Sequence, residues 1–105
     1  MNVKKRCLPY GWYPYDAPSV MTMLDTWDSE QGTDSLEPAA LACVAPHAGW
    51  AYSGSLAWRA WKQAVSADTV VILGGHLPAA SPFVVARNDA YESPLGIIEA
   101  NKELM

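Results

Sequence analysis

A chain of 105 residues is long enough for one small domain with a single core. Half of its residues are apolar and 17% are charged, which excludes a disordered polyampholyte, and its net charge of -4 argues against binding to a nucleic-acid backbone. No stretch approaches the ~20 apolar residues of a membrane span, and the N-terminus lacks the apolar core of a signal peptide, so we expect a cytoplasmic protein without nucleic-acid or membrane partners.

The N-terminal part is predicted to be an extended arm over residues 1–15, followed by an α/β body over 16–105. The arm contains RCLPYGWYPY, whose prolines exclude a regular helix or a central strand. Asp16 is a suitable N-cap for a helix over 17–30 that ends near Gly32, with Asp28 on its solvent face.

The rest of the chain alternates between apolar runs and one amphipathic segment. ALACVA at 40–45, which holds Cys43, is predicted to be a buried strand, and LAWRAWKQAV at 56–65 a helix. Further strands are expected at 69–73, 83–87 and 97–100, a turn at 92–96 and a helix opening at Asn101. The fold class is therefore α/β, with a βαβ-based mixed or parallel sheet and flanking helices.

Each of the two histidines follows a predicted strand. His47 comes after the strand at 40–45, and His76 after the strand at 69–73. Parallel strands in a βαβ unit end at the same edge of the sheet, where ligands bind in open α/β folds. The sequence therefore predicts that both imidazoles reach one site, where neutral histidines suit a transition metal. A metal site needs further ligands, and separate hydrogen-bonded loop histidines are the alternative.

Small and aromatic residues around the histidines are candidates for the pocket. Glycine allows a sharp turn and a close approach of the backbone to a ligand. Tyr52 is the candidate for an acid/base or substrate contact. The other predicted pocket residues are Gly49, Trp50, Ser53, Gly54, Gly74 and Gly75. Asp89 or Glu92 would complete a two-histidine-one-carboxylate set, with solvated loop acids as the simpler interpretation.

Four segments resemble the Memo-like family, also called AmmeMemoRadiSam system protein B. VAPHAGWAYSG at 44–54 and VVILGGH at 70–76 are similar to its two histidine motifs. PYGWYPYDAPSVMTML at 9–24, after Arg6, resembles the opening of the family, and YESPLG at 91–96 resembles its later turn. The resemblance covers nearly the whole chain.

The resemblance implies a fold like that of the class III extradiol ring-cleavage dioxygenases, with His47 and His76 lining a metal-type pocket. Iron or copper is the implied cofactor, with zinc less favoured, and the implied activity is that of a metal-dependent oxidoreductase. Trp50 replaces the usual tyrosine of the family. Family members are also much longer, and their later part supplies another histidine and a cysteine. The resemblance thus implies the N-terminal portion of a Memo-like fold, either as a fragment or as a truncated relative with an incomplete site. Its uncovered apolar surface favours a homo-oligomer.

Two functions remain open at this point. One is metal-dependent oxidation through His47 and His76. The other is a non-catalytic Memo-like module that binds a small-molecule or peptide ligand with an incomplete metal site. A serine hydrolase is disfavoured because there is no G-x-S-x-G motif.

Overall fold

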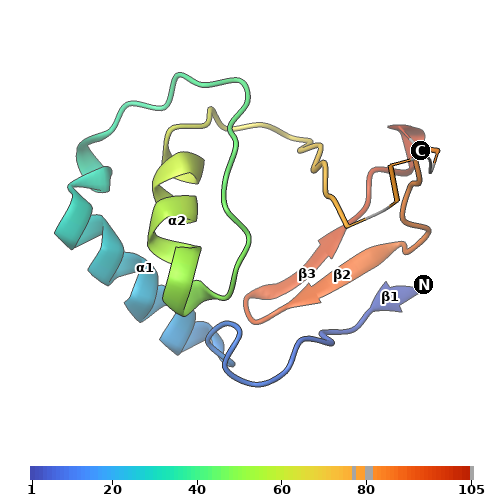
Figure 1. Cartoon of the computed structure of the whole chain (residues 1–105), viewed down its shortest axis with the longest axis horizontal. Coiled ribbons are helices and arrows are strands. Elements are labelled where there is room, and N and C mark those ends of the chain that lie inside the picture. The colour runs from blue at the N-terminus through green and yellow to red at the C-terminus, as the bar shows by residue number, and fades with distance from the viewer. Residues whose placement is uncertain (77, 80–81, 105) are drawn as a thin grey trace. The chain divides into compact units, whose positions relative to one another are not determined.

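The computed structural model describes residues 1–76, 78–79 and 82–104 and has a mixed α/β fold (Figure 1). Its α-helices are α1 (Ala17–Gln31) and α2 (Ser55–Lys62), and its strands are β1 (Val3–Lys4), β2 (Ala90–Ser93) and β3 (Gly96–Glu99). Shorter turns of helix are η1 (Thr33–Ser35), η2 (Trp50–Gly54) and η3 (Lys102–Leu104). The predicted α/β class is confirmed.

The chain divides into two compact units. Unit 1 comprises 1–6, 67–93 and 97–105, and unit 2 comprises 7–66 and 94–96. Unit 1 contains a sheet with the strand order β1-β2-β3, in which β1 pairs parallel to β2. A two-residue turn joins β2 to β3, so this second pair is an antiparallel hairpin. The predicted turn at 92–96 and the strand that follows it are confirmed.

The N-terminal residues contribute an edge strand that is fixed by acidic side chains. Asp89 accepts a hydrogen bond from the Asn2 backbone N–H at 2.6 Å. It also forms an ion pair with Lys102, whose Nζ lies 2.6 Å from its carboxylate. Glu92 accepts a bond from the Arg6 N–H at 3.2 Å and lies 3.9 Å from Lys5 Nζ. The predicted arm therefore begins as a short strand, because it pairs with β2 and binds the carboxylates of Asp89 and Glu92, which lie far from it in sequence.

Helix α1 has the ends that its sequence predicts. Asp16 caps the N-terminus by accepting a 2.9 Å hydrogen bond from the Ser19 N–H. At the other end Gly32 has φ +65°, and its N–H bonds to the Asp28 carbonyl. A left-handed glycine satisfies helix carbonyls without the steric cost of a Cβ, so the chain leaves the helix here. Helix α2 lies beside α1 in unit 2 (Figure 1).

The three apolar runs at 40–45, 69–73 and 83–87 are not strands, although the structure describes all of their residues. A single parallel bridge joins Ala40 to Ala64. A strand requires a neighbour that takes its backbone hydrogen bonds, and high β-propensity does not replace that neighbour. The predicted strands at 40–45, 69–73 and 83–87 are therefore wrong.

Few apolar side chains are buried in the described residues. Val20 and Ala90 are the buried apolar ones, at 4% and 0% exposure. Cys43 was predicted to be buried but is exposed, because the run that contains it has no sheet around it. The helix predicted to open at Asn101 begins with Lys102, and Asn101 Oδ1 accepts the Glu103 N–H at 3.1 Å. Met105, at its predicted end, lies outside the described residues.

Candidate ligand-binding turn

The first histidine motif forms a tight turn that leads directly into α2. The Tyr52 and Ser53 backbone N–H groups both donate to the Gly49 carbonyl, at 2.9 and 3.2 Å. The Ser53 hydroxyl donates to the Ala48 carbonyl at 3.1 Å. Residues 50–54 adopt a π-helical turn, a rare conformation that is frequent at functional sites. The turn thus presents the residues before and within it in a fixed geometry.

Tryptophans of the N-terminal segment and of α1 contact this turn. The Trp50 N–H donates to the Trp12 carbonyl at 2.9 Å, which ties the N-terminal aromatic segment to the motif. The Trp27 ring of α1 packs against Trp50, with ring centroids 5.4 Å apart and an interplanar angle of 43°. Tilted aromatic pairs at this distance are favourable. The rings of Trp27 and Trp50 therefore hold the motif against α1.

Gly54 is required by close packing. A Cβ at this position would overlap Cη2 of Trp27 and would lie 3.1 Å from its Cζ2 and 3.2 Å from the Trp50 Cβ. Gly49, which precedes the turn, is also buried, and a Cβ added there would lie 3.6 Å from Cε3 of the Trp12 ring. Gly49 and Gly54 were both predicted as pocket residues, and in the structure a side chain at either position would meet a tryptophan.

The polar side chains of the motif face solvent. His47 is exposed, and Tyr52 is 88% exposed. Trp50 and Ser53 are half-buried. Imidazole, phenol and indole together offer hydrogen-bond donors, acceptors and a flat apolar surface. The arrangement suits recognition of a ligand at the surface of unit 2.

The second histidine lies in unit 1, at the end of the run 69–73. His76 is exposed and has φ +71°, a left-handed conformation that is uncommon outside glycine. Gly74 and Gly75, immediately before it, have open space around them. Of the residues that follow this motif, positions 77, 80 and 81 lie outside the described residues. Since His47 belongs to unit 2, the predicted meeting of the two imidazoles stays a prediction.

Within its described residues, the structure does not bring three metal ligands together. In residues 1–76, 78–79 and 82–104, no group of three histidine, cysteine or acidic side chains could hold a metal ion. The two carboxylates considered as a third ligand, Asp89 and Glu92, instead bind the backbone and lysines of the N-terminal segment. A stable transition-metal site generally needs three or four protein ligands.

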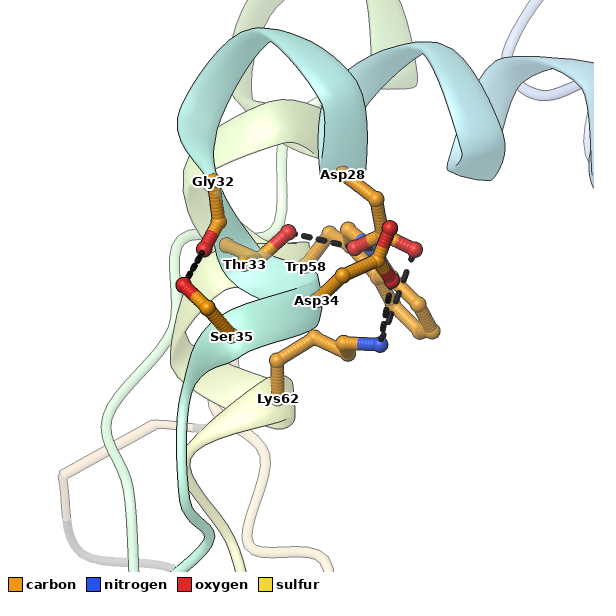
Figure 2. A network of polar contacts seen from close by, with 7 residues as sticks. All are labelled: Asp28, Gly32, Thr33, Asp34, Ser35, Trp58 and Lys62. Atoms are coloured by element: carbon orange, nitrogen blue, oxygen red, sulfur yellow. Dashed lines mark hydrogen bonds and ion pairs between the residues drawn. The ribbon is translucent and has the colours of Figure 1, made fainter.

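A polar network between α1 and α2 was missed by the sequence analysis (Figure 2). Asp28, predicted to face solvent, is 7% exposed and accepts hydrogen bonds from the Thr33 hydroxyl and, at 2.8 Å, from Trp58 Nε1. Lys62 Nζ lies 3.5 Å from both Asp28 Oδ2 and Asp34 Oδ1. Lys62 also lies over the Trp58 ring, 5.3 Å from its centroid.

This network stabilises the charged form of Asp28. The Thr33 hydroxyl is the main cause that lowers the pKa of this carboxyl below its ordinary value of 3.8, with Trp58 and Lys62 contributing and burial opposing. The available sequence signal was the spacing of Trp58 and Lys62, which places an indole N–H and an ammonium on one face of α2. Only the packing of the two helices shows that this face meets Asp28.

Together these features define a class of protein: a mixed α/β protein whose P-H-A-G and Y-S-G residues form an aromatic-supported turn at the start of a helix. Within the described residues, no helix has both the length and the apolar character needed to cross a bilayer.

The family is shown by comparison with known proteins. The family model described as Memo-like protein matches residues 10–105, and the chain belongs to this family. A MEMO1 family protein of Aquifex aeolicus is 30% identical over 99% of this chain and 39% of its own length. Another from Thermococcus kodakarensis is 37% identical over 90% of this chain and 33% of its own length.

A third relative, from Methanosarcina barkeri, is 40% identical over 70% of this chain and 28% of its own length. The chain therefore spans less than two-fifths of the length of these relatives. No solved structure matches the chain significantly.

Proposed function

We propose that this chain is a ligand-binding part of a Memo-like protein, in which the turn at 47–54 presents His47 and Tyr52 to a small molecule or peptide. The supporting observation is the fixed turn itself. Its backbone is held by Gly49 and Trp12, while its imidazole and phenol remain accessible. Binding by a preorganised turn loses little conformational entropy.

A small aromatic diol is the simplest probe of such a turn. Its ring can stack on the indole of Trp50, and its hydroxyls can exchange hydrogen bonds with the Tyr52 phenol and the His47 imidazole. Catechol is also the substrate type that the resemblance to extradiol dioxygenases suggests. In this proposal the chain binds such a ring without oxidising it.

Catechol binding can be followed by quenching of tryptophan fluorescence, because Trp50 lies within the turn. We expect Tyr52→Phe to weaken binding about two- to tenfold, which corresponds to one neutral hydrogen bond. His47→Ala should weaken it by a similar factor. The matched control is Tyr10→Phe, which removes a phenol that is 91% exposed elsewhere in unit 2 and should leave binding unchanged. Equal affinity in all four proteins would exclude the turn as the binding site.

The second candidate is a metal-dependent oxidoreductase, favoured by the two exposed imidazoles and the family they resemble. His47 and His76 would be two of its ligands, and iron or copper would supply the redox chemistry. The donors in the described residues do not complete the site, so we derive no reaction step through a metal.

Elemental analysis separates the two candidates. The chain would be loaded anaerobically with Fe(II), Cu(I) or Zn(II), desalted, and compared with His47→Ala and His76→Ala. We expect no stoichiometric metal in any of the three proteins. Near-stoichiometric metal in the wild type that is lost in both variants would establish a shared metal site and favour the oxidoreductase.

A further inference from the structure

Two tyrosines of the N-terminal aromatic segment form an exposed pair in unit 2. Tyr10 is 91% exposed and Tyr15 is 64% exposed. Their ring centroids lie 6.4 Å apart, with an interplanar angle of 44°. Tilted aromatic rings at this separation are in favourable contact, so the two phenols lie side by side although both are open to solvent.

The backbone holds both rings of this pair. Tyr10 is the second residue of a turn that is closed by a hydrogen bond from the Trp12 N–H to the Pro9 carbonyl, at 3.3 Å. Gly11 follows it with φ +98°, and a type II turn requires a positive φ at this position. Tyr15 lies directly before the N-cap of α1. The pair is therefore fixed between a closed turn and the start of a helix.

Phenols in this arrangement are suited to oxidative coupling. We propose that Tyr10 and Tyr15 are an intramolecular crosslinking site, joined as dityrosine by a peroxidase with hydrogen peroxide as the oxidant. Each phenol loses one electron and its hydroxyl proton, which gives a phenoxyl radical. The two radicals form a carbon–carbon bond between their ortho positions, and the two ortho hydrogens move to the phenol oxygens. Hydrogen peroxide accepts the two electrons and two protons and becomes two water molecules.

The other tyrosines are less suited to this coupling. Tyr13 is half-buried, and Tyr91 is half-buried in β2 of unit 1. Tyr52 is 88% exposed but belongs to the turn at 50–54, a different segment. A partner in the same short segment has an effective concentration in the millimolar range, roughly a thousandfold above that of a second chain at micromolar concentration. Coupling within the segment should therefore exceed coupling between chains.

The crosslink would also act on the first histidine motif. It closes a loop over 10–15 that contains Trp12, whose carbonyl accepts the Trp50 N–H at 2.9 Å. Closing a loop lowers the conformational entropy of the unfolded chain, so the link would reinforce this attachment of the turn. The proposal does not depend on the binding of a ligand by the turn.

The test treats the chain at micromolar concentration with a peroxidase and hydrogen peroxide, stops the reaction with catalase, and then reduces any disulfides. Dityrosine fluorescence measures the yield, and mass spectrometry should show a monomer that has lost two hydrogens. Chymotrypsin cuts after Trp12, so the peptides that contain Tyr10 and Tyr15 stay joined only where the link is present. Fragmentation of the joined peptides identifies the linked residues.

Variants distinguish the fixed pair from chance coupling. Tyr10→Phe and Tyr15→Phe should each lower the yield at least about tenfold, because the remaining phenol must find a partner in another molecule. Tyr13→Phe, from the same segment, is the matched control and should keep the yield. Gly11→Ala strains the turn without removing a phenol and should lower the yield while the helical circular dichroism is unchanged.

Two results would overturn the proposal. One is a set of links that join separate chains, or in which Tyr13 or Tyr52 replaces a member of the pair. The other is a Gly11→Ala variant with the yield of the wild type, which would show that the closed turn does not hold the two phenols together.

Discussion

At the scale of single residues, Gly54 and Asp28 determine how α1 and α2 meet. Gly54 lets the Trp27 ring approach the backbone of the turn at 50–54. Asp28 receives the Thr33 hydroxyl, the Trp58 indole N–H and the Lys62 ammonium, so the first helix is bound to the second by polar contacts. The absence of a side chain at Gly54 and the carboxylate of Asp28 thus allow α1 and α2 to pack together next to the first histidine motif.

Gly54→Ala should destabilise the chain by about 1–3 kcal/mol, the usual cost of excess volume at a close contact. The added methyl would overlap the Trp27 ring, and this cost exceeds the gain of up to ~1 kcal/mol that alanine offers over glycine in a helix. Thermal unfolding followed by tryptophan fluorescence measures the change. Gly74→Ala, at a glycine with open space around it, is the control and should be nearly neutral. Equal effects of the two substitutions would contradict the close-packing explanation.

Asp28→Asn should lower the unfolding midpoint at pH 7, because it removes the ion pair with Lys62 and places an amide N–H₂ group near the ammonium. The pKa of Asp28 is lowered in the folded chain. Its contribution to stability is therefore fully present above the ordinary value of 3.8 and is lost as the pH falls through the lower folded pKa. Urea unfolding of both proteins between pH 7 and pH 2 should show their difference shrinking in acid.

Asp25→Asn on the same helix is the matched control for this pH series. Asp25 is exposed, and its substitution should change stability little at any pH. A difference between wild type and Asp28→Asn that stays constant down to pH 2 would show that the charge of Asp28 does not contribute through its lowered pKa.

At the scale of elements, α1 was predictable because its signals are local. Asp16 at the start and Gly32 at the end fix its bounds through hydrogen bonds within a few residues. The turn at 92–96 is local in the same sense, since Pro94 and Leu95 join two adjacent strands. The runs at 40–45 and 69–73 have an apolar composition that is typical of buried strands, yet they form no sheet. A strand depends on a neighbour that is distant in sequence.

Gly32→Ala tests the end of α1. Alanine at φ +65° should cost about 1–2 kcal/mol of stability, and this cost comes from the backbone alone because no atom lies within 4 Å of the added methyl. Gly32→Asn should cost less, since asparagine tolerates the left-handed region. Chemical denaturation of the three proteins gives the order. An alanine variant as stable as wild type would mean that the helix end has shifted from Gly32.

At the scale of the whole molecule, the two units provide separate probes. All five tryptophans lie in unit 2, so their fluorescence reports on that unit. The exchange of the amides of β2 reports on unit 1. Contacts of Asp89 with Asn2 and Lys102 lie entirely in unit 1, and those of Gly54 with Trp27 lie in unit 2.

Asp89→Asn should therefore accelerate amide exchange in β2 while it leaves the fluorescence-detected unfolding midpoint unchanged. Its contacts with Lys102 and the Asn2 N–H fix the edge strand, and weakening them acts on the sheet. Gly54→Ala should show the opposite pattern. Hydrogen exchange by mass spectrometry and fluorescence on the same samples check both. If either substitution moves both probes equally, its effect is not confined to the unit that holds its contacts.

The sequence by itself determined the features whose interactions are close along the chain: α1 with its two caps, the turn before β3 and the motifs that identify the family. The tertiary structure decided which side chains are buried and which runs pair. Asp28 is buried because α2 delivers Trp58 and Lys62 to it, and residues 69–73 are exposed because no strand in the described chain lies beside them. Burial and pairing depend on partners distant in sequence, whereas caps and turns are set by their immediate neighbours.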